Sequence, residues 1–221
     1  MTAATSEERL LELTPTIEYV YGRVLELENL KYGWKHVKET SDCTVHSRPS
    51  KDFEGFIFKS DGLIPAPPEV VFDLVAPGAG KPGRGRWDTS VHSSEVIEQL
   101  STDIDIRLTR TLPVFMSLIS AREFVDVVKV TREDDRIFTA CVSIEHPDYG
   151  AKSSKGIRGT CYPNGLFCYR VQGNANATRL IQYIHSDLGG MLPQSLIDSA
   201  TPSVMASNYK QLKAFLKKEK F

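Results

Sequence analysis

The sequence predicts an α+β fold built on one antiparallel sheet of about nine strands, with helices at its two ends and on one face. Strand patterns joined by short polar turns fill most of residues 34–186, one short helix interrupts them, and a helical pattern occupies each end of the chain. The length of 221 residues suits one domain, and no polar linker or internal repeat divides the chain. We therefore expect a single domain over residues 1–221, whose strongly curved sheet encloses volume against one long helix.

The N-terminal helix is predicted by two start signals. Thr5 and Glu8 have the spacing of a capping box, and Thr14-Pro15 supplies a second cap and a first-turn proline that restart the helix. An amphipathic face follows and ends near Tyr32-Gly33. A further short helix is expected at 68–75, and strands are expected over 34–40, 44–48, 53–64, 94–100, 104–111, 123–131, 137–144, 157–169 and 180–186.

The last fifth of the chain predicts the end of a strand, a glycine break and one long helix. Gly189-Gly190 lets the backbone turn freely, Pro193 suits a first helical turn, and Pro202 should bend the helix because it lacks an N–H group. One face of this helix is only half apolar. It could pack on the sheet with a few surface polar groups, or it could form a lid over a cavity of mixed polarity. The face consists of Ile197, Thr201, Val204, Asn208 and Leu212.

The connection Leu112–Ser120 between two strands is rich in large apolar side chains. A solvated loop should not have this composition. We therefore expect the connection to pack against another part of the fold, over the mouth of a pocket.

Two polar residues in the strands have open interpretations. Strand 123–131 is apolar on both faces, with Phe124 and Val128 on one of them, and is expected to be buried on two sides. Asp126 shares the face of Phe124 and Val128, where it either needs a partner or lies near a solvated patch. His185 ends the last strand, either as a hydrogen-bonded structural histidine or as a donor to a pocket.

Several classes of function find no support in the sequence. The net charge is −1 and no basic stripe is interleaved with aromatic residues, which argues against a nucleic-acid partner. The histidines are scattered and no CxxC pair occurs, so no metal site is expected. Gly78–Gly83 matches a dinucleotide-binding motif only literally, because a helix precedes it and Pro82 removes a donor, so no cofactor is expected. No secretory or membrane-spanning pattern occurs, and a cytoplasmic protein is expected.

Five segments together resemble the StAR-related lipid-transfer (START) domain, in the order and spacing of that family. The resemblance covers essentially the whole chain. It implies a helix-grip fold, in which a curved nine-stranded antiparallel sheet surrounds a hydrophobic tunnel closed by a long C-terminal helix. The chain resembles the minimal, single-domain soluble branch, which is associated with sterols, oxysterols and bile-acid-like steroids. The segments are Trp87-Asp88, Ile119–Val125, Glu145–Pro147, Ile157–Gly159 and Ser186–Pro193.

The resemblance also implies a binding site. Connection 112–120 corresponds to the family's gate, together with the C-terminal helix. Cholesterol-binding members bury an acidic residue and an arginine in the tunnel, and the aligned positions here are Thr109 and Val128, which carry no charge. Recognition of cholesterol through that pair is therefore not expected. The expected ligand-binding residues are Thr109, Phe115, Phe124, Asp126, Val128, Tyr183, His185, Ile197, Thr201, Val204 and Asn208.

The expected function is non-enzymatic intracellular binding and transfer of one hydrophobic lipid by a monomer that contacts membranes transiently. A cluster of lysines at the end of the last helix, between Lys210 and Lys220, either docks on anionic membrane or is simply a solvated helix end. The alternative is a cyclase-like or hydrolase-like enzyme of the wider helix-grip superfamily. That enzyme would need acid–base groups in the tunnel, for which His185 and Asp126 are the candidates.

Overall fold

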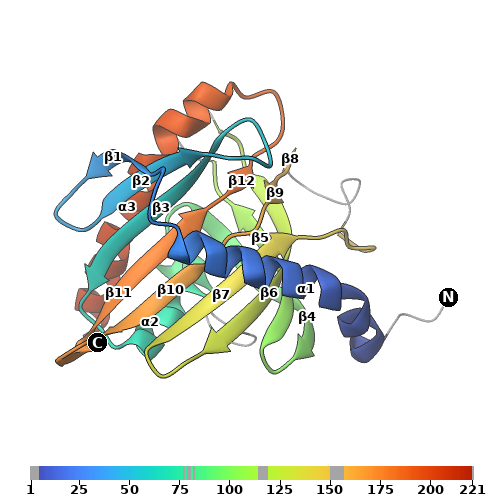
Figure 1. Ribbon diagram of the computed structural model, residues 1–221, viewed down its shortest axis with the longest axis horizontal. Helices are drawn as coiled ribbons and strands as arrows, with labels where there is room; N and C mark the ends of the chain where they lie inside the picture. Colours follow the sequence, from blue (N-terminus) through green and yellow to red (C-terminus); the bar gives the residue numbers. More distant parts are fainter. Residues whose placement is uncertain are drawn as a thin grey trace.

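The computed structural model describes residues 5–76, 78, 81, 83–113, 119–149 and 157–220, and it has the α+β architecture that the sequence predicts (Figure 1). Three α-helices accompany the sheet: α1 (Ser6–Asn29), α2 (Pro68–Val75) and α3 (Gln194–Glu219). A short 3-10 helix, η1, spans Arg84–Arg86. The strands are β1 (Lys35–Glu39), β2 (Thr44–Pro49), β3 (Phe56–Ile64), β4 (Val91–Ser101), β5 (Ile104–Thr111), β6 (Arg122–Arg132), β7 (Arg136–Ser143), β8 (Ile157–Arg158), β9 (Thr160–Cys161), β10 (Leu166–Val171), β11 (Asn174–Ile184) and β12 (Ser186–Asp187).

The large sheet has the strand order β1-β2-β3-β11-β10-β7-β6-β5-β4, and neighbouring strands along this path are antiparallel. Strand β8 pairs with β6 in parallel, and β9 and β12 form a separate small ladder. The sheet remains open, with β1 and β4 at its two edges. The last long strand, β11, lies between β3 and β10, so strands from the start and the end of the chain meet in the middle of the sheet.

Helix α1 lies across one face of the sheet (Figure 1). The predicted capping box is present, since the Thr5 side chain accepts the Glu8 N–H and the Glu8 carboxylate accepts the Thr5 N–H. The expected restart at Thr14-Pro15 is wrong, because Pro15 lies inside one continuous helix. Burial of one apolar stripe along the helix offsets the cost of the proline, which is about 3 kcal/mol in a helix interior. The stripe consists of Leu13, Ile17, Val20, Val24 and Leu27.

Helices α2 and α3 pack on the opposite face of the sheet, where they share one apolar core with strands β2, β3, β10 and β11. Figure 1 shows α3 behind the sheet and α1 in front of it. No helix among the residues described is long and apolar enough to cross a membrane.

The single strand expected over 157–169 is instead divided into β8, β9 and β10. Gly165 marks the last division, because a Cβ atom there would lie 2.0 Å from the backbone oxygen of Thr139 on β7. The chain approaches β7 so closely at this position that only glycine fits. By contrast, the expectation that β6 is buried on both faces is confirmed from Arg122 to Val128.

Candidate functional site

A cavity of about 220 Å³ lies on the α3 side of the sheet. Strands β4 to β7, β10 and β11 supply its walls, the end of α2 and η1 border it, and Asn208 of α3 borders it from the helix side. Most of the surface that lines the cavity is apolar, but more than half of the lining residues carry a polar group, so the space differs from a dry apolar core.

A row of three polar residues crosses the sheet wall of this cavity. Arg107 on β5 is directly opposite Asp126 on β6, which is directly opposite Ser143 on β7. Directly opposed residues point to the same face of a sheet, so strand pairing brings these side chains together. The Ser143 hydroxyl donates a hydrogen bond of 2.6 Å to Asp126 Oδ1 and accepts one of 2.8 Å from the Cys161 N–H.

Arg107 is held by a carboxylate on its own strand. Its Nε and Nη2 groups donate to Asp105 Oδ1 and Oδ2, at 2.6 and 2.9 Å, and both side chains are buried. Residues two apart on a strand lie on one face, which is why the pair forms within β5. The Nη1 group of Arg107 has no hydrogen-bond partner among the described residues, so its donors remain for an acceptor in the cavity.

Asp126 is a buried carboxyl group, so the alternative of a solvated aspartate is wrong. Burial raises its pKa from 3.8 to about 6. The hydrogen bonds from Ser143 and Cys161 and the charges of Arg158 and Arg107 act in the opposite direction and limit the shift. Near neutral pH this group can therefore accept hydrogen bonds as a carboxylate, and in mild acid it can donate one.

The other polar groups of the cavity lie toward α3 and η1. The hydroxyls of Ser94 and Thr109 are 3.2 Å apart. Arg84 donates to Asp88, which is completely buried, through a contact of 2.5 Å. On α3, the Oδ1 atom of Asn208 is buried and has no partner among the described residues. A buried acceptor without a donor is costly, so this atom suits a hydroxyl or N–H of a bound molecule.

Two cysteines line the cavity as neutral thiols. Burial raises the pKa of both Cys141 and Cys161 well above the ordinary value. Cys141 Sγ donates to Asn164 Oδ1 at 3.1 Å, and Cys161 Sγ lies 3.4 Å from the hydroxyl of Ser186. The thiolate is the nucleophilic form of cysteine, so these groups serve as weak polar wall atoms rather than as nucleophiles.

Six of the expected ligand-binding residues border the cavity. Five of them, on β5, β6 and α3, form its wall, whereas the sixth, Tyr183, packs its ring beneath α1 and donates its hydroxyl to the backbone oxygen of Leu27 at 3.3 Å. Tyr183 therefore directs its hydroxyl away from the cavity. The residues that form the wall are Thr109, Phe124, Asp126, Val128 and Asn208.

His185 is not part of the cavity lining. Its Nδ1 atom lies 3.2 Å from the backbone oxygen of Pro163, which can only accept, so Nδ1 carries the proton and Nε2 accepts from the Ser50 hydroxyl at 2.7 Å. Burial lowers its pKa, in keeping with a neutral ring. Both ring nitrogens therefore make hydrogen bonds to other residues of the fold, Ser50 and Pro163. This arrangement is the one expected of a structural histidine rather than of a donor to a pocket.

The remaining expected residues lie elsewhere. Ile197 is buried outside the cavity lining, and the Thr201 hydroxyl donates to the Ile197 backbone oxygen at 2.7 Å. Val204 borders a separate surface hollow of about 240 Å³, which shares Asn208 with the cavity. Phe115, together with most of connection 112–120, lies outside the described residues.

Sequence reasoning missed Asp105, Arg107 and Ser143. The first two could have been found from the alternation along strand 104–111, which places them on the same face as Thr109. Ser143 could not, because its approach to Asp126 depends on the register between β6 and β7. In the described part of the chain, no group of three or more metal-ligating side chains converges.

An open antiparallel sheet that holds a long C-terminal helix over an internal cavity defines the helix-grip class of proteins. Within this class the chain belongs to the START family, since a START domain matches residues 16–220. It is 38% identical over 202 residues to StAR-related lipid transfer protein 5 of Bos taurus, covering 91% of this chain and 94% of that protein. StAR-related lipid transfer protein 4 of Homo sapiens is 31% identical over 183 residues, covering 83% and 86% of the two chains.

The solved structures agree with this assignment. The structure of human StAR-related lipid transfer protein 5 has a TM-score of 0.88 and 31% sequence identity, covering 96% of this chain and all of that one. The lipid transfer and protein localization domain of human StarD13 has a TM-score of 0.68 at 16% identity, covering 88% of this chain and 94% of that one, which shows the shared fold alone.

Proposed function

We propose that this chain binds one lipid molecule in the internal cavity and transfers it between membranes without altering it. The observation that carries the proposal is the cavity of about 220 Å³ that the sheet and Asn208 of α3 border, in a fold whose relatives are named as lipid transfer proteins. Pockets for drug-sized ligands usually measure roughly 300–1,000 Å³. A sterol-sized ligand would therefore have to enlarge the cavity as it enters, which requires part of the wall to move.

The polar groups of the cavity favour a steroid that carries several oxygen atoms. The unused Nη1 donors of Arg107 and the carboxyl of Asp126 suit a hydroxyl or keto group near the middle of the ligand. The orphan Oδ1 atom of Asn208 suits a hydroxyl at another point of the ligand. A sterol with one hydroxyl would leave most of these groups unpaired, and unpaired buried polar groups weaken binding.

The charged pair of this cavity also differs in position from the pair that the family resemblance places at Thr109 and Val128. Here the arginine and its carboxylate are Arg107 and Asp105, which lie two and four residues before Thr109 on the same face of β5. The ligand oxygen that meets this pair should therefore lie nearer the start of β5 than Thr109 does.

A second candidate function rests on Asp126 alone. A buried carboxyl group whose pKa is raised to about 6 can act as a general acid or base, which is the one observation that favours a helix-grip enzyme. The partner expected for it, His185, has both nitrogens engaged with Ser50 and Pro163. The enzyme would be favoured if the chain converts a bound steroid into a product and Asp126→Asn abolishes this turnover. The carrier would be favoured if every bound steroid is recovered unchanged.

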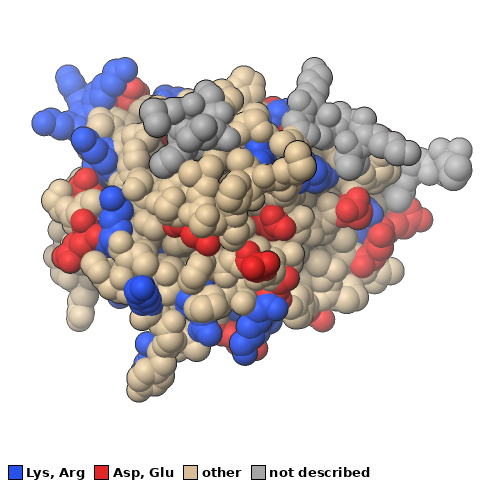
Figure 2. All heavy atoms as spheres, turned by 90° about the horizontal axis from the view of Figure 1, so that it is seen from above, with Lys and Arg blue, Asp and Glu red and all other residues tan. Residues whose placement is uncertain are grey.

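We also propose that the protein is a cytoplasmic monomer that contacts membranes transiently. Figure 2 shows Lys and Arg side chains gathered near one end of the molecule, with both signs of charge over the rest of the face in view. Among the lysines of the α3 end, Lys213 is paired with Asp42 at 2.8 Å, whereas Lys217 and Lys218 are exposed. Exposed lysines would contribute a weak, salt-dependent attraction to anionic lipid.

Ligand binding can be tested directly on the purified chain. Native mass spectrometry and the ligand-induced shift in melting temperature would be measured with cholesterol, a dihydroxysteroid, a steroid carboxylate and phosphatidylcholine. We expect one bound molecule per chain and the largest shift with a steroid that carries several oxygens. A chain that takes up none of these lipids and shows no shift would overturn the proposal.

Two variants can show whether the buried charges of Asp105 and Arg107 contribute to ligand binding, or whether loss of any arginine on β5 has the same effect. The double variant Asp105→Asn/Arg107→Gln removes both buried charges together, which avoids leaving one unpaired. It should weaken binding of the hydroxylated steroid by about tenfold, equivalent to about 1.4 kcal/mol, with little change for cholesterol. Arg110→Gln on the opposite face of the same strand, where Arg110 pairs with Glu123, is the control and should leave both affinities unchanged.

A further inference from the structure

A row of directly opposed side chains crosses the α1 side of the sheet near the edge that β1 forms. His36 on β1 is opposite His46 on β2, and His46 is opposite Lys59 on β3. Lys59 in turn is opposite Tyr183 on β11, which packs beneath α1. Directly opposed residues point to the same face of a sheet, so the two histidines are neighbours on that face. Neither of them lines the cavity, so the proposed lipid site leaves the pair without a role.

The spacing of the two imidazole rings suits a shared metal ion. The ring centres of His36 and His46 are 5.4 Å apart, and the ring planes are inclined at 78°. Two imidazoles bound to one tetrahedral zinc ion through bonds of about 2.0–2.1 Å have ring centres roughly 5 Å apart. The strand register therefore already places both rings at the required separation, and rotation about their side-chain bonds is enough to aim a nitrogen of each at one point.

A β-bulge brings a carboxylate to the same face. Residues three apart on a regular strand point to opposite faces. The pairing of β1 with β2 shifts between His36 and Lys38, and this extra residue returns Glu39 to the face of His36. Glu39 Oε2 lies 3.7 Å from His36 Nε2. The three side chains do not converge on one point as they stand, but Glu39 is 71% exposed, so its carboxylate can turn toward the pair without breaking a buried contact.

Two positive side chains flank His46 on this face. Lys59 is opposite it on β3, and Arg48 is two residues along β2. Both place their charge over the ring of Trp34, with Lys59 Nζ 5.9 Å and Arg48 Cζ 5.7 Å from its centre. The negative face of an aromatic ring attracts cations. The ring therefore offsets part of the repulsion that these groups would exert on a metal ion at the histidine pair.

The chemistry of the three side chains is that of a transition-metal site. Neutral imidazole is a ligand of Zn²⁺, Cu²⁺ and Ni²⁺. Burial and the charges of His36 and Lys59 lower the pKa of His46, whereas Asp61 acts in the opposite direction, so this ring is neutral near neutral pH and presents a lone pair. Two imidazole nitrogens and one carboxylate oxygen leave the fourth position of a tetrahedral ion to water.

We propose that His36, His46 and Glu39 form a binding site for one divalent transition-metal ion, which joins β1 to β2 at the edge of the sheet. The sequence gives no sign of the site, because spacing motifs cannot show a pair formed across two strands. Since the site lies on the α1 side of the sheet and the cavity on the α3 side, the proposal does not depend on lipid binding. Cu²⁺ should bind more tightly than Zn²⁺, as is usual for such ligands.

Calorimetric titration with ZnCl₂ tests the ligands, on the full chain purified without a histidine tag. We expect one ion per chain, and a loss of affinity of about tenfold or more in His36→Gln and in His46→Gln, because each variant removes one ligand. Glu39→Gln should weaken binding by a smaller factor. His92 is exposed on β4 at the opposite edge of the sheet, so His92→Gln is the control and should match the unmodified chain. Absence of saturable binding, or full affinity in the double variant His36→Gln/His46→Gln, would overturn the proposal.

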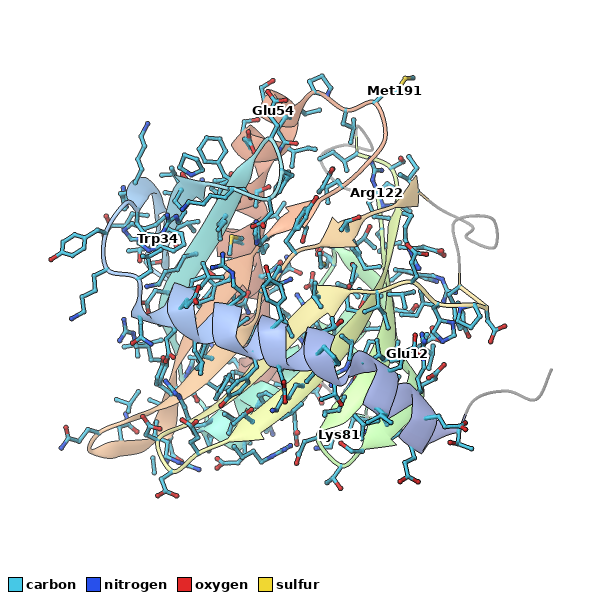
Figure 3. The ribbon with its side chains drawn as sticks, turned by 45° about the vertical axis from the view of Figure 1, so that its right-hand side comes forward. Glu12, Trp34, Glu54, Lys81, Arg122 and Met191 are labelled. Atoms are coloured by element: carbon cyan, nitrogen blue, oxygen red, sulfur yellow. The ribbon has the colours of Figure 1, made fainter. Side chains whose placement is uncertain are left out.

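Copper gives a local optical measurement, because Cu²⁺ quenches the fluorescence of an indole close to it. Trp34 precedes His36 by two residues, and Figure 3 shows it beside the first strands of the sheet, past the end of α1. The other tryptophan, Trp87, is buried in the core on the α3 side. We expect CuCl₂ to quench part of the emission of the unmodified chain and to quench little in Trp34→Phe. Equal fractional quenching in Trp34→Phe would place the ion elsewhere and overturn the proposal.

A chemical protection experiment needs no variant, so it decides the question even if a variant fails to fold. Diethyl pyrocarbonate acylates free imidazole nitrogens, and peptide mass spectrometry measures the modification of each histidine. Saturating ZnCl₂ should protect His36 and His46 and leave His92 as reactive as before. Protection of neither histidine of the pair, or equal protection of all three, would overturn the proposal.

Discussion

Pro202 divides α3 into two halves that belong to one helix but differ in what they bury. The second half covers an apolar core formed with α2 and strands β2, β3, β10 and β11. Asn208, in the middle of the helix, borders the cavity together with polar residues of β5 and β6. Apolar burial fixes the second half, since it contributes roughly 25 cal/mol per Å². The first half buries only Ile197 and Ala200, and neither belongs to an apolar cluster of the described residues.

The first prediction tests this contrast with the largest expected effect. Leu212→Ala should lower the free energy of unfolding by about 2–5 kcal/mol, because it leaves a cavity in the core. Ile197→Ala, in the first half, should cost less, about 2 kcal/mol at the low end of that range, since its side chain belongs to no apolar cluster of the described residues. Equilibrium unfolding in urea measures both, and equal losses would contradict the division of the helix at Pro202.

The second prediction concerns the buried carboxyl of the cavity and its dependence on pH. The pKa of Asp126 in the folded chain is about 6, above its ordinary value of 3.8, so the folded state binds a proton more tightly than the unfolded state does. Its contribution to stability is therefore most favourable below about pH 4 and is lost as the pH rises through 6. Asp126→Asn should raise the free energy of unfolding by up to about 3 kcal/mol at pH 7.5 and leave it nearly unchanged at pH 4.

Asp88 provides the matched control for this measurement. It is also buried, and burial alone would raise its pKa, but the charge of Arg84 and hydrogen bonds from Ser90 and Arg84 lower it below the ordinary value. Its stabilisation is therefore present at neutral pH and is lost in acid. Asp88→Asn should lower stability at pH 7.5, opposite in sign to Asp126→Asn. Melting temperatures of both variants and of the unmodified chain would be measured over pH 4–8. If both variants shift the melting temperature at pH 7.5 in the same direction, this assignment is contradicted.

The third prediction has the smallest effect and compares one hydroxyl from each half of α3. Tyr209→Phe removes a bond of 2.7 Å and leaves the buried Leu180 oxygen without that donor, which should cost about 1–2 kcal/mol. Thr201→Val removes only a local bond to the backbone oxygen of Ile197, which should change the free energy of unfolding by less than about 0.5 kcal/mol. Thermal unfolding distinguishes them, and a larger loss for Thr201→Val would argue against a loosely attached first half.

Much of the fold could be predicted from local patterns. The capping box at Thr5 and Glu8, the two-faced apolar pattern of β6 and the glycine turn before α3 are confirmed because each depends on residues close together in the chain. The prediction that the helix restarts at Pro15 is wrong for a related reason. A local start signal competed with the burial of a long apolar stripe against the sheet, and that burial is a property of the whole fold.

The candidate site was predictable only in part. The alternation along β5 and β6 places Thr109, Phe124, Asp126 and Val128 on faces that border the cavity. The family pattern brought Asn208 into the expected set, but it also brought in Val204, which borders a different hollow. Helix periodicity gives the face of a residue, whereas the space that the face meets depends on how the helix lies on the sheet.

The sequence by itself determined the order of the elements, the family of the fold and the presence of a half-polar terminal helix. Only the tertiary structure decided that Arg107, Asp126 and Ser143 stand in one row, that Asp126 is buried with a partner, and that Arg122 binds the turn before α3. The physical reason is the distance along the chain. Arg122 and Leu188 are 66 residues apart, and only strand pairing and packing bring their atoms to 2.7 Å.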